Sequence, residues 1–205
     1  MASAWHDVTI LITQQFQPKT DPAARGLAAF AARVSYALMM LTLTWGVLVA
    51  TGWIRNVTGR KALRSTHMVL ATATLVFAGV HALGFFYLTI SPYTLEYLFI
   101  PFGSGQEARH IAGILGFEVM LAIAITAGFQ RFSSYRRWLW LHRMAYPAVA
   151  LTAIHAWFGA IANGHLSIVW LCGITLAIPA VTTSVLRFLP ARTLERIGLV
   201  EEQVA

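Results

Sequence analysis

The sequence predicts an all-α integral membrane protein, a bundle of five transmembrane helices, from its composition and from the length of its apolar runs. Hydrophobic residues make up 58% of the 205 residues and charged residues only 11%, too few to cover a soluble globule. Five apolar runs reach or approach the roughly 20 residues that cross a bilayer as a helix. They are residues 34–54, 67–90, 111–129, 138–161 and 166–186. Each run must be helical, because lipid cannot satisfy an open backbone.

Polar composition sets the expected boundaries of the membrane domain. Residues 1–25 form a polar extramembrane segment, residues 26–189 the transmembrane domain, and residues 190–205 a cytoplasmic tail. The first segment lacks a basic stretch followed by an apolar core, so no cleavable signal peptide is expected. The loop 91–110 is long and aromatic, and its prolines and glycines predict an ordered cap at the membrane interface.

The basic residues predict the orientation of the chain in the membrane. The net charge of +7 comes from residues at helix ends rather than from one basic face or tail, which argues against a nucleic-acid partner. One side carries eleven of them: Arg55, Arg60, Lys61, Arg64, Arg131, Arg136, Arg137, Arg143, Arg187, Arg192 and Arg196. The other side carries Lys19, Arg25, Arg33 and Arg109. The positive-inside rule then predicts a multi-pass cell-membrane protein with its amino terminus outside and its carboxyl terminus in the cytoplasm.

Four of the seven histidines lie within apolar runs, where ionisable side chains are costly and rare. His67 and His81 lie on the second run, and His142 and His155 on the fourth. These two helices are separated by one intervening helix, so they run in the same direction. His67 and His142 are therefore expected near the cytoplasmic face, with His81 and His155 about 20 Å further out.

Helical periodicity decides which way these side chains face. The fourteen-residue gap from His67 to His81 returns to within about 40° of the same helical face. The thirteen-residue gap from His142 to His155 leaves about 140° of mismatch on an ideal helix. Pro147 lies between them and removes one helical hydrogen bond, so the sequence requires a break or wide turn there.

Two pairs of imidazoles at two depths suit two six-coordinate haem irons, each held by one histidine from either helix. Zinc fits less well, since structural zinc takes four clustered ligands. Two other interpretations stay open. The histidines could instead hydrogen-bond across helices and bind nothing, or they could serve a proton relay, although Glu118 is the one carboxylate within a membrane run.

Two segments resemble the ferric-reductase-like transmembrane domain: "LRSTHMVLATATLVFAGVHALG" and "RRWLWLHRMAYPAVALTAIHAWFGAIANG". That family includes NADPH oxidases, ferric reductases and the haem-binding membrane subunit of the methionine-sulfoxide reductase system. The resemblance covers roughly residues 30–188 and rests on the two histidine spacings and the "LHR" entry into the fourth run. It implies two bis-histidine b-type haems, one bound by His67 with His142 and the other by His81 with His155.

The expected function is that of a di-haem cytochrome b relaying electrons between a cytoplasmic donor and an outer acceptor or a quinone. Reductases of the family carry a flavin and nicotinamide domain, and no glycine-rich phosphate motif occurs in this sequence. The resemblance therefore implies an electron-transfer subunit of an oxidoreductase that works with a separate flavin or other redox protein. The alternatives are a haem-free structural subunit of a larger membrane complex and a proton or ion transporter.

A few further residues are candidates for supporting roles. Arg60, Arg64 and Arg143 are expected near the cytoplasmic ligands, where a guanidinium could pair with haem propionates. The remaining histidines and one acid fall on the outer side and could gather into a metal or acceptor site, although scattered interfacial residues are commoner: His6, His110, His165 and Glu107. Four tryptophans near run ends are expected in the interfacial belt: Trp53, Trp138, Trp157 and Trp170.

Overall fold

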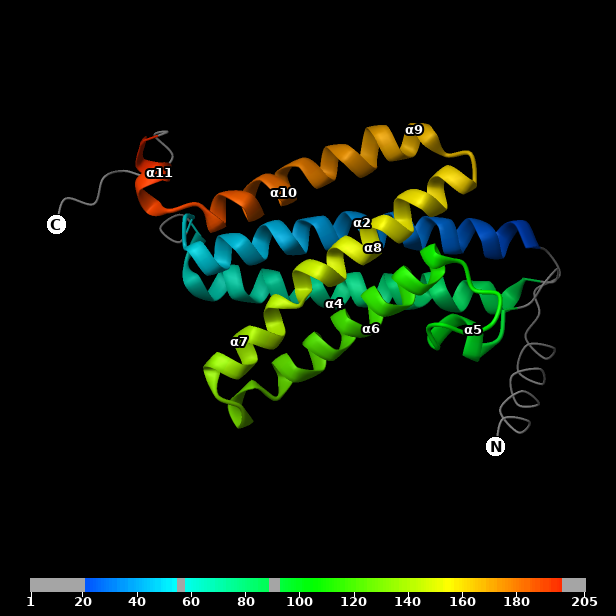
Figure 1. Ribbon diagram of the computed structural model, residues 1–205, viewed down its shortest axis with the longest axis horizontal. Helices are drawn as coiled ribbons and strands as arrows, with labels where there is room; N and C mark the ends of the chain where they lie inside the picture. Colours follow the sequence, from blue (N-terminus) through cyan, green and yellow to red (C-terminus); the bar gives the residue numbers. More distant parts are fainter. Residues whose placement is uncertain (1–20, 55–57, 89–92, 197–205) are drawn as a thin grey trace.

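The computed structural model describes residues 21–54, 58–88 and 93–196, which form a bundle of long helices (Figure 1). The long helices are α2 (Asp21–Thr51), α4 (Arg60–Gly84), α6 (Ala108–Gly128), α7 (Tyr135–Arg143), α8 (Ala145–Ala162) and α10 (Thr175–Phe188). The short ones are η1 (Phe85–Tyr87), α5 (Leu95–Phe99), η2 (Gln130–Phe132), α9 (Leu166–Ile168), a π-helical turn (Val169–Ile174) and α11 (Ala191–Arg196). Among these described residues, five stretches are long and apolar enough to cross a membrane, which confirms the predicted fold class.

The first two spans begin earlier than their apolar runs. Helix α2 starts at Asp21, thirteen residues before the predicted start at residue 34. Its first turns are rich in alanine, which favours helix. The exposed Arg25 and Arg33 lower the local hydropathy, so an apolar run alone does not mark the start of this helix. Helix α4 starts at Arg60, so His67 lies two turns inside the helix and not at its end.

Helices α2 and α4 pack against each other along their length, and polar side chains join them inside the apolar interface. The Ser35 hydroxyl donates to the Thr74 carbonyl at 3.0 Å, and the Thr42 and Thr74 hydroxyls lie 3.3 Å apart. Near the other end, Trp45 Nε1 donates to the Leu63 carbonyl at 3.0 Å. Hydrogen bonds between helices suit an apolar medium, where a lone polar group would be costly.

Helices α6 and α8 form a second close pair. A Cβ on Gly116 would lie 3.0 Å from the Ala148 carbonyl oxygen and 3.2 Å from the Thr152 backbone nitrogen, so only glycine allows this approach. Ala148 beneath it is 1% exposed. Small residues at the crossing thus bring two helix backbones together, as is usual between membrane helices.

Helix α10 joins the bundle by packing against α2. The contact is a core cluster of Tyr36, Met39 and Met40 from α2 with Ala177 and Ala180 from α10. By contrast, α4 and α8 do not pack closely against each other. The bundle therefore contains two tight helix pairs, α2 with α4 and α6 with α8, and a looser space between α4 and α8.

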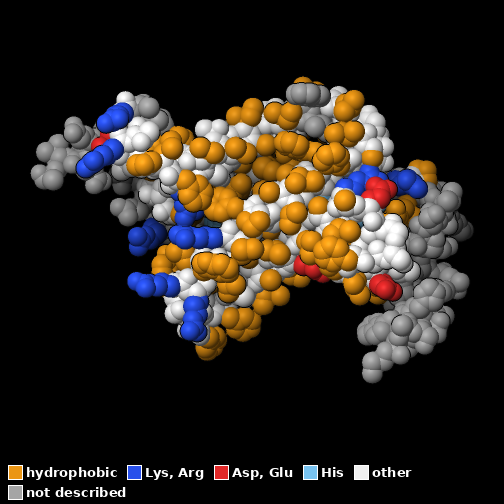
Figure 2. All heavy atoms as spheres, viewed as in Figure 1, with side chains coloured by type: hydrophobic (Ala, Val, Ile, Leu, Met, Phe, Trp, Pro, Cys, Tyr) orange, Lys and Arg blue, Asp and Glu red, His pale blue; other side chains and the backbone are white. Residues whose placement is uncertain are grey.

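The surface has the polarity expected of a membrane protein. Apolar side chains cover the middle of the face in Figure 2, whereas Lys and Arg gather at its left end and lie again beside acidic side chains toward its right end. Side chains such as Val69, 67% exposed, and Leu171, 73% exposed, have no protein neighbours to cover them. Such a large exposed apolar surface is stable only against lipid.

The predicted cap between the second and third spans is a short helix held by hydrogen bonds. Thr94 caps α5 by accepting from the Tyr97 backbone nitrogen at 3.1 Å. Gln106 Nε2 donates to the carbonyls of Tyr97 and Ile100, both at 2.8 Å. These contacts fix Tyr97 at the end of the bundle where α6 begins.

The Gly116 contact predicts a stability difference between two glycines in membrane helices. Gly116→Ala should destabilise the protein by about 1–3 kcal/mol, because the new Cβ overpacks the α6–α8 crossing. Gly159→Ala on α8 is the matched control, since its Cβ would meet no atom within 4 Å. Alanine there should be neutral or stabilising by up to about 1 kcal/mol. Thermal unfolding of both purified variants tests this, and equal unfolding midpoints would contradict the packing described.

Candidate functional site

The fourth span is broken at Met144, between α7 and α8. The Met144 backbone nitrogen donates to the Leu141 carbonyl at 3.0 Å, which tightens the last turn of α7. The α-helical hydrogen bonds resume when the Ala148 backbone nitrogen donates to the Met144 carbonyl at 3.1 Å. Pro147 is the third residue of α8, where its missing N–H group is not needed within the helix. An interruption is therefore present three residues before the proline, but it is a tightened turn within one long span, Tyr135–Ala162, and not the wide turn at Pro147 that the histidine spacing led us to expect.

The inner pair is formed by His67 on α4 and His142 at the end of α7. Their ring centroids are 6.1 Å apart and their ring planes are inclined by 67°. The indole of Trp138 stacks on the His142 ring, with centroids 4.9 Å apart. The two imidazoles thus meet across the space between α4 and the fourth span.

The outer pair is formed by His81 on α4 and His155 on α8. Its ring centroids are also 6.1 Å apart and its planes are also inclined by 67°. Phe85 lies edge-on to His81 at 5.1 Å. The pairs are fourteen residues apart on α4, about 21 Å along the helix axis. The same imidazole arrangement therefore occurs at two levels of the bundle.

Backbone carbonyls fix the imidazole tautomers of the outer pair. His81 Nδ1 lies 2.9 Å from the Ala28 carbonyl oxygen, and His155 Nδ1 lies 2.8 Å from the Arg109 carbonyl oxygen. A carbonyl oxygen only accepts, so each Nδ1 carries a hydrogen and donates it. The lone pair of each neutral ring is then on Nε2, the nitrogen left available for a metal.

The inner pair carries buried polar atoms without partners. Nδ1 of His67, Nδ1 of His142 and Nε1 of Trp138 are buried and make no hydrogen bond within the described residues. The Thr42 carbonyl lies close to His67, but the contact falls short of hydrogen-bond geometry. Buried polar atoms without partners are uncommon and costly, so this cluster fits a site completed by a bound group.

Two glycines make room for one histidine of each pair. A Cβ on Gly46 of α2 would lie 3.0 Å from His67 Cε1. A Cβ on Gly113 of α6 would lie 2.6 Å from His155 Nδ1 and 2.7 Å from its Cγ, which no real structure tolerates. The helices flanking α4 and α8 therefore lack side chains where they pass the imidazoles.

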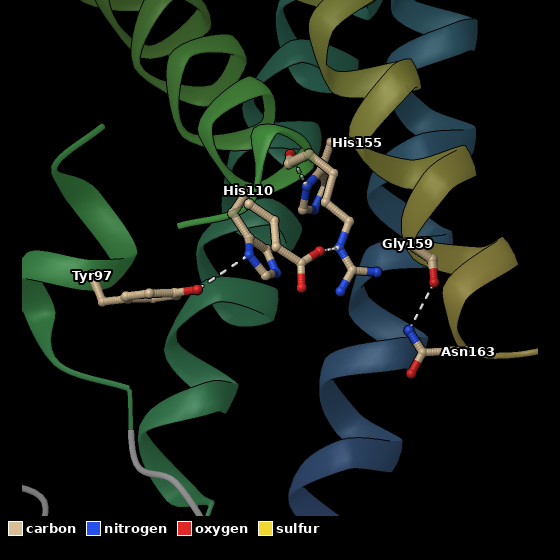
Figure 3. A network of polar contacts seen from close by, with 7 residues as sticks. Tyr97, His110, His155, Gly159 and Asn163 are labelled. Carbon is tan, nitrogen blue, oxygen red and sulfur yellow. Dashed lines mark hydrogen bonds and ion pairs between the residues drawn. The ribbon is translucent and has the colours of Figure 1, made fainter. Parts of the chain in front are cut away.

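An aromatic and charged cluster lies beside the outer pair (Figure 3). The ring centroid of His110 is 6.3 Å from that of His155, and the Tyr97 hydroxyl is 3.3 Å from His110 Nδ1. Arg109 Nε pairs with the Glu107 carboxylate at 2.6 Å. Burial, together with the neighbouring Tyr93 and Glu107, raises the pKa of Tyr97, so its phenol stays protonated at neutral pH.

The chemistry of the two pairs fits haem. Imidazole nitrogens bind transition metals at about 2.0–2.1 Å, so two rings on opposite sides of one metal have centroids roughly 6 Å apart. Within the described residues, no group of three or more His, Cys, Asp or Glu side chains could hold a metal ion. Two protein ligands suffice only when a porphyrin supplies the other four.

The arginines predicted near the cytoplasmic ligands lie on α4 and α7, the helices that carry His67 and His142. Arg60 and Arg143 are exposed, and Arg64 bonds to the Gln130 side chain at 3.2 Å. Arg187 of α10 was not predicted, yet it lies within electrostatic reach of His142 and donates to the Tyr146 hydroxyl at 2.9 Å. Its position follows from the packing of α10, which no local motif reveals.

The outer residues are only partly brought together. His110 and Glu107 lie near the outer pair, whereas His165 is exposed after α8 and His6 falls outside the described residues. Glu118 is half-buried on α6.

Two of the tryptophans expected at the interface serve inside the bundle, since Trp138 stacks on His142 and Trp157 donates to the Tyr36 hydroxyl at 3.0 Å. The side chain of Trp170 falls outside the described part.

Comparison with known proteins identifies the family. The model of the family described as "Ferric reductase like transmembrane component" matches residues 31–153, more than half of the chain. No curated protein and no solved structure matches the chain. The matched region contains α4, α6 and α7 with three of the paired histidines, His67, His81 and His142. His155 lies two residues beyond the end of the match. The chain belongs to the ferric-reductase-like transmembrane family of membrane redox proteins.

Proposed function

We propose that this protein is a di-haem cytochrome b that relays electrons across the bilayer as a subunit of an oxidoreductase. The observation that carries the proposal is the repeated pairing of imidazoles, with the same 6.1 Å separation and 67° inclination at both levels. His67 with His142 would hold one haem b, and His81 with His155 the other. Each bound haem supplies a one-electron iron couple, chemistry that no side chain of the protein offers.

The protein's own residues perform three tasks at these sites. The carbonyls of Ala28 and Arg109 hold the outer imidazoles in the tautomer that leaves Nε2 free. Gly46 and Gly113 leave the space that the imidazoles occupy. The tight pairs α2 with α4 and α6 with α8 keep the histidines on rigid elements, so their separation does not depend on mobile loops.

The end of the bundle that carries the basic residues is proposed to face the cytoplasm. Exposed Arg131, Arg136 and Arg137 lie at the turn into α7, and Arg192 and Arg196 lie on α11 at the same end (Figures 1 and 2). The inner pair is near this end, where a separate flavin or other redox protein would deliver electrons. The outer pair and its Tyr97–His110 cluster would face the acceptor or a quinone. A negative cell interior favours outward electron movement by about 2.3 kcal/mol per 100 mV.

Removal of one ligand tests the pairing. His81→Ala should lose about one haem per chain and keep the inner haem, because His67 and His142 are untouched. His155→Ala should lose the same haem, and His165→Ala should lose none, because that side chain is exposed outside both pairs. Haem is quantified per purified chain from reduced-minus-oxidised absorption spectra. An unchanged haem content in both His81→Ala and His155→Ala would refute the pairing.

The glycine that makes room for His155 predicts a second, subtler effect. Gly113→Ala should displace the His155 ring and weaken outer haem binding by about 10- to 100-fold, the usual effect of disturbing a ligand's surroundings. Titration of haem into the protein purified without it measures this affinity. Gly159→Ala is the control on the neighbouring helix, and the idea fails if both variants bind the second haem as the unmodified protein does.

A further inference from the structure

A groove of about 270 Å³ lies between α2, α8 and α10, and none of the four paired histidines lines it. Its walls are almost entirely apolar, with Val149, Ala150 and Ala153 on α8 and Ala177 and Val181 on α10. Alanines on both helices create the hollow, because longer side chains at those positions would fill it. In a membrane, an apolar chain fills such a hollow on a lipid-facing surface. An empty gap would lose dispersion contacts, and water would find no hydrogen-bond partners on apolar walls.

Polar bridges join α8 to the fifth span at both ends of this groove, through Tyr36 of α2 and the π-helical turn at one end and directly to α10 at the other. At one end, Trp157 Nε1 donates to the Tyr36 hydroxyl at 3.0 Å, and Tyr36 donates to the Gly173 carbonyl at 2.8 Å. At the other end, Arg187 Nη1 donates to the Tyr146 hydroxyl at 2.9 Å. The helices are thus held apart at a fixed spacing, and the groove is part of the folded architecture.

The groove has the length of one membrane leaflet. Along α10 its lining runs from Ala177 to Phe188, eleven residues or about 16 Å of helix. Half of the hydrocarbon core is about 15 Å thick. Phe188 ends α10 at the arginine-rich end of the bundle, so the groove runs from that end about half the thickness of a hydrocarbon core along the helix.

The mouth of the groove is positively charged. Arg187 is half-buried there and uses one N–H group for Tyr146, which leaves four of its five donors for a ligand. Arg143 ends α7 three residues before Tyr146 and adds a second positive charge at this end. A guanidinium pairs best with a phosphate or carboxylate group. A quinone headgroup is uncharged and would leave the positive charge of Arg187 without an anionic partner.

We infer that the groove binds an anionic phospholipid, with one acyl chain between α8 and α10 and its phosphate on Arg187. A single-leaflet apolar slot ending at a cation matches an acyl chain joined to a phosphate. Basic pockets between membrane helices bind anionic headgroups in the same way. None of the four paired histidines lines the groove, although Arg187 at its mouth lies within electrostatic reach of His142.

The test compares an anionic and a zwitterionic lipid with identical acyl chains. Phosphatidylglycerol and phosphatidylcholine with identical acyl chains are titrated into the full-length protein in detergent, and bound lipid is counted by native mass spectrometry. Phosphatidylglycerol should bind about five- to tenfold more tightly. Arg187→Gln should abolish this preference, whereas Arg192→Gln, at an exposed position of α11, should retain it.

A second pair of variants tests the groove itself. Ala150→Phe should fill the hollow and reduce binding of both lipids, while Ala124→Phe, on the exposed surface of α6, should leave both affinities unchanged. Equal affinities for the two lipids in the unmodified protein would overturn the inference, as would equal effects of Arg187→Gln and Arg192→Gln. A prenylated quinone that displaces phosphatidylglycerol at lower concentration would overturn it too and assign the groove to quinone.

Discussion

The break between α7 and α8 at Met144 is the constraint on which both histidine pairs depend. On an unbroken helix His142 and His155 would face directions about 140° apart, and only one of them could reach α4. The broken span lets both rings meet α4 partners with the same separation and inclination. Pro147 ensures the break, because an unbroken helix would place its ring against the Arg143 carbonyl. One irregular turn therefore determines whether the bundle presents two paired levels or one.

The two pairs are alike in geometry but differ in their surroundings. Neighbouring helices hold both outer imidazoles through backbone carbonyls, whereas the inner imidazoles and Trp138 keep buried nitrogens without partners in the described residues. The space between α4 and α8 exists because α4 packs closely against α2, and α8 against α6, instead of against each other. Close packing in one direction thus leaves room in the other, which is how a helical bundle accommodates a large prosthetic group.

The sequence predicts much of this arrangement because depth and face follow from helix geometry. The five spans, the matched depths of the histidines and the need for a break near Pro147 depend only on rise and rotation per residue. Gly46, Gly113, Trp138 and Arg187 could not be predicted, because their roles depend on which helix lies beside which. The early start of α2 was missed for another reason. Arg25 and Arg33 lower its hydropathy, although alanine-rich sequence continues the helix.

The central claim is that each imidazole pair holds one haem. The most direct measurement is the amount of haem b per chain in the unmodified protein purified from a host supplied with haem, together with its reduced-minus-oxidised spectrum. Two haems per chain, with the sharp bands of six-coordinate bis-histidine iron, are the expected result. A chain that is fully folded and binds one haem, or none, would contradict the account.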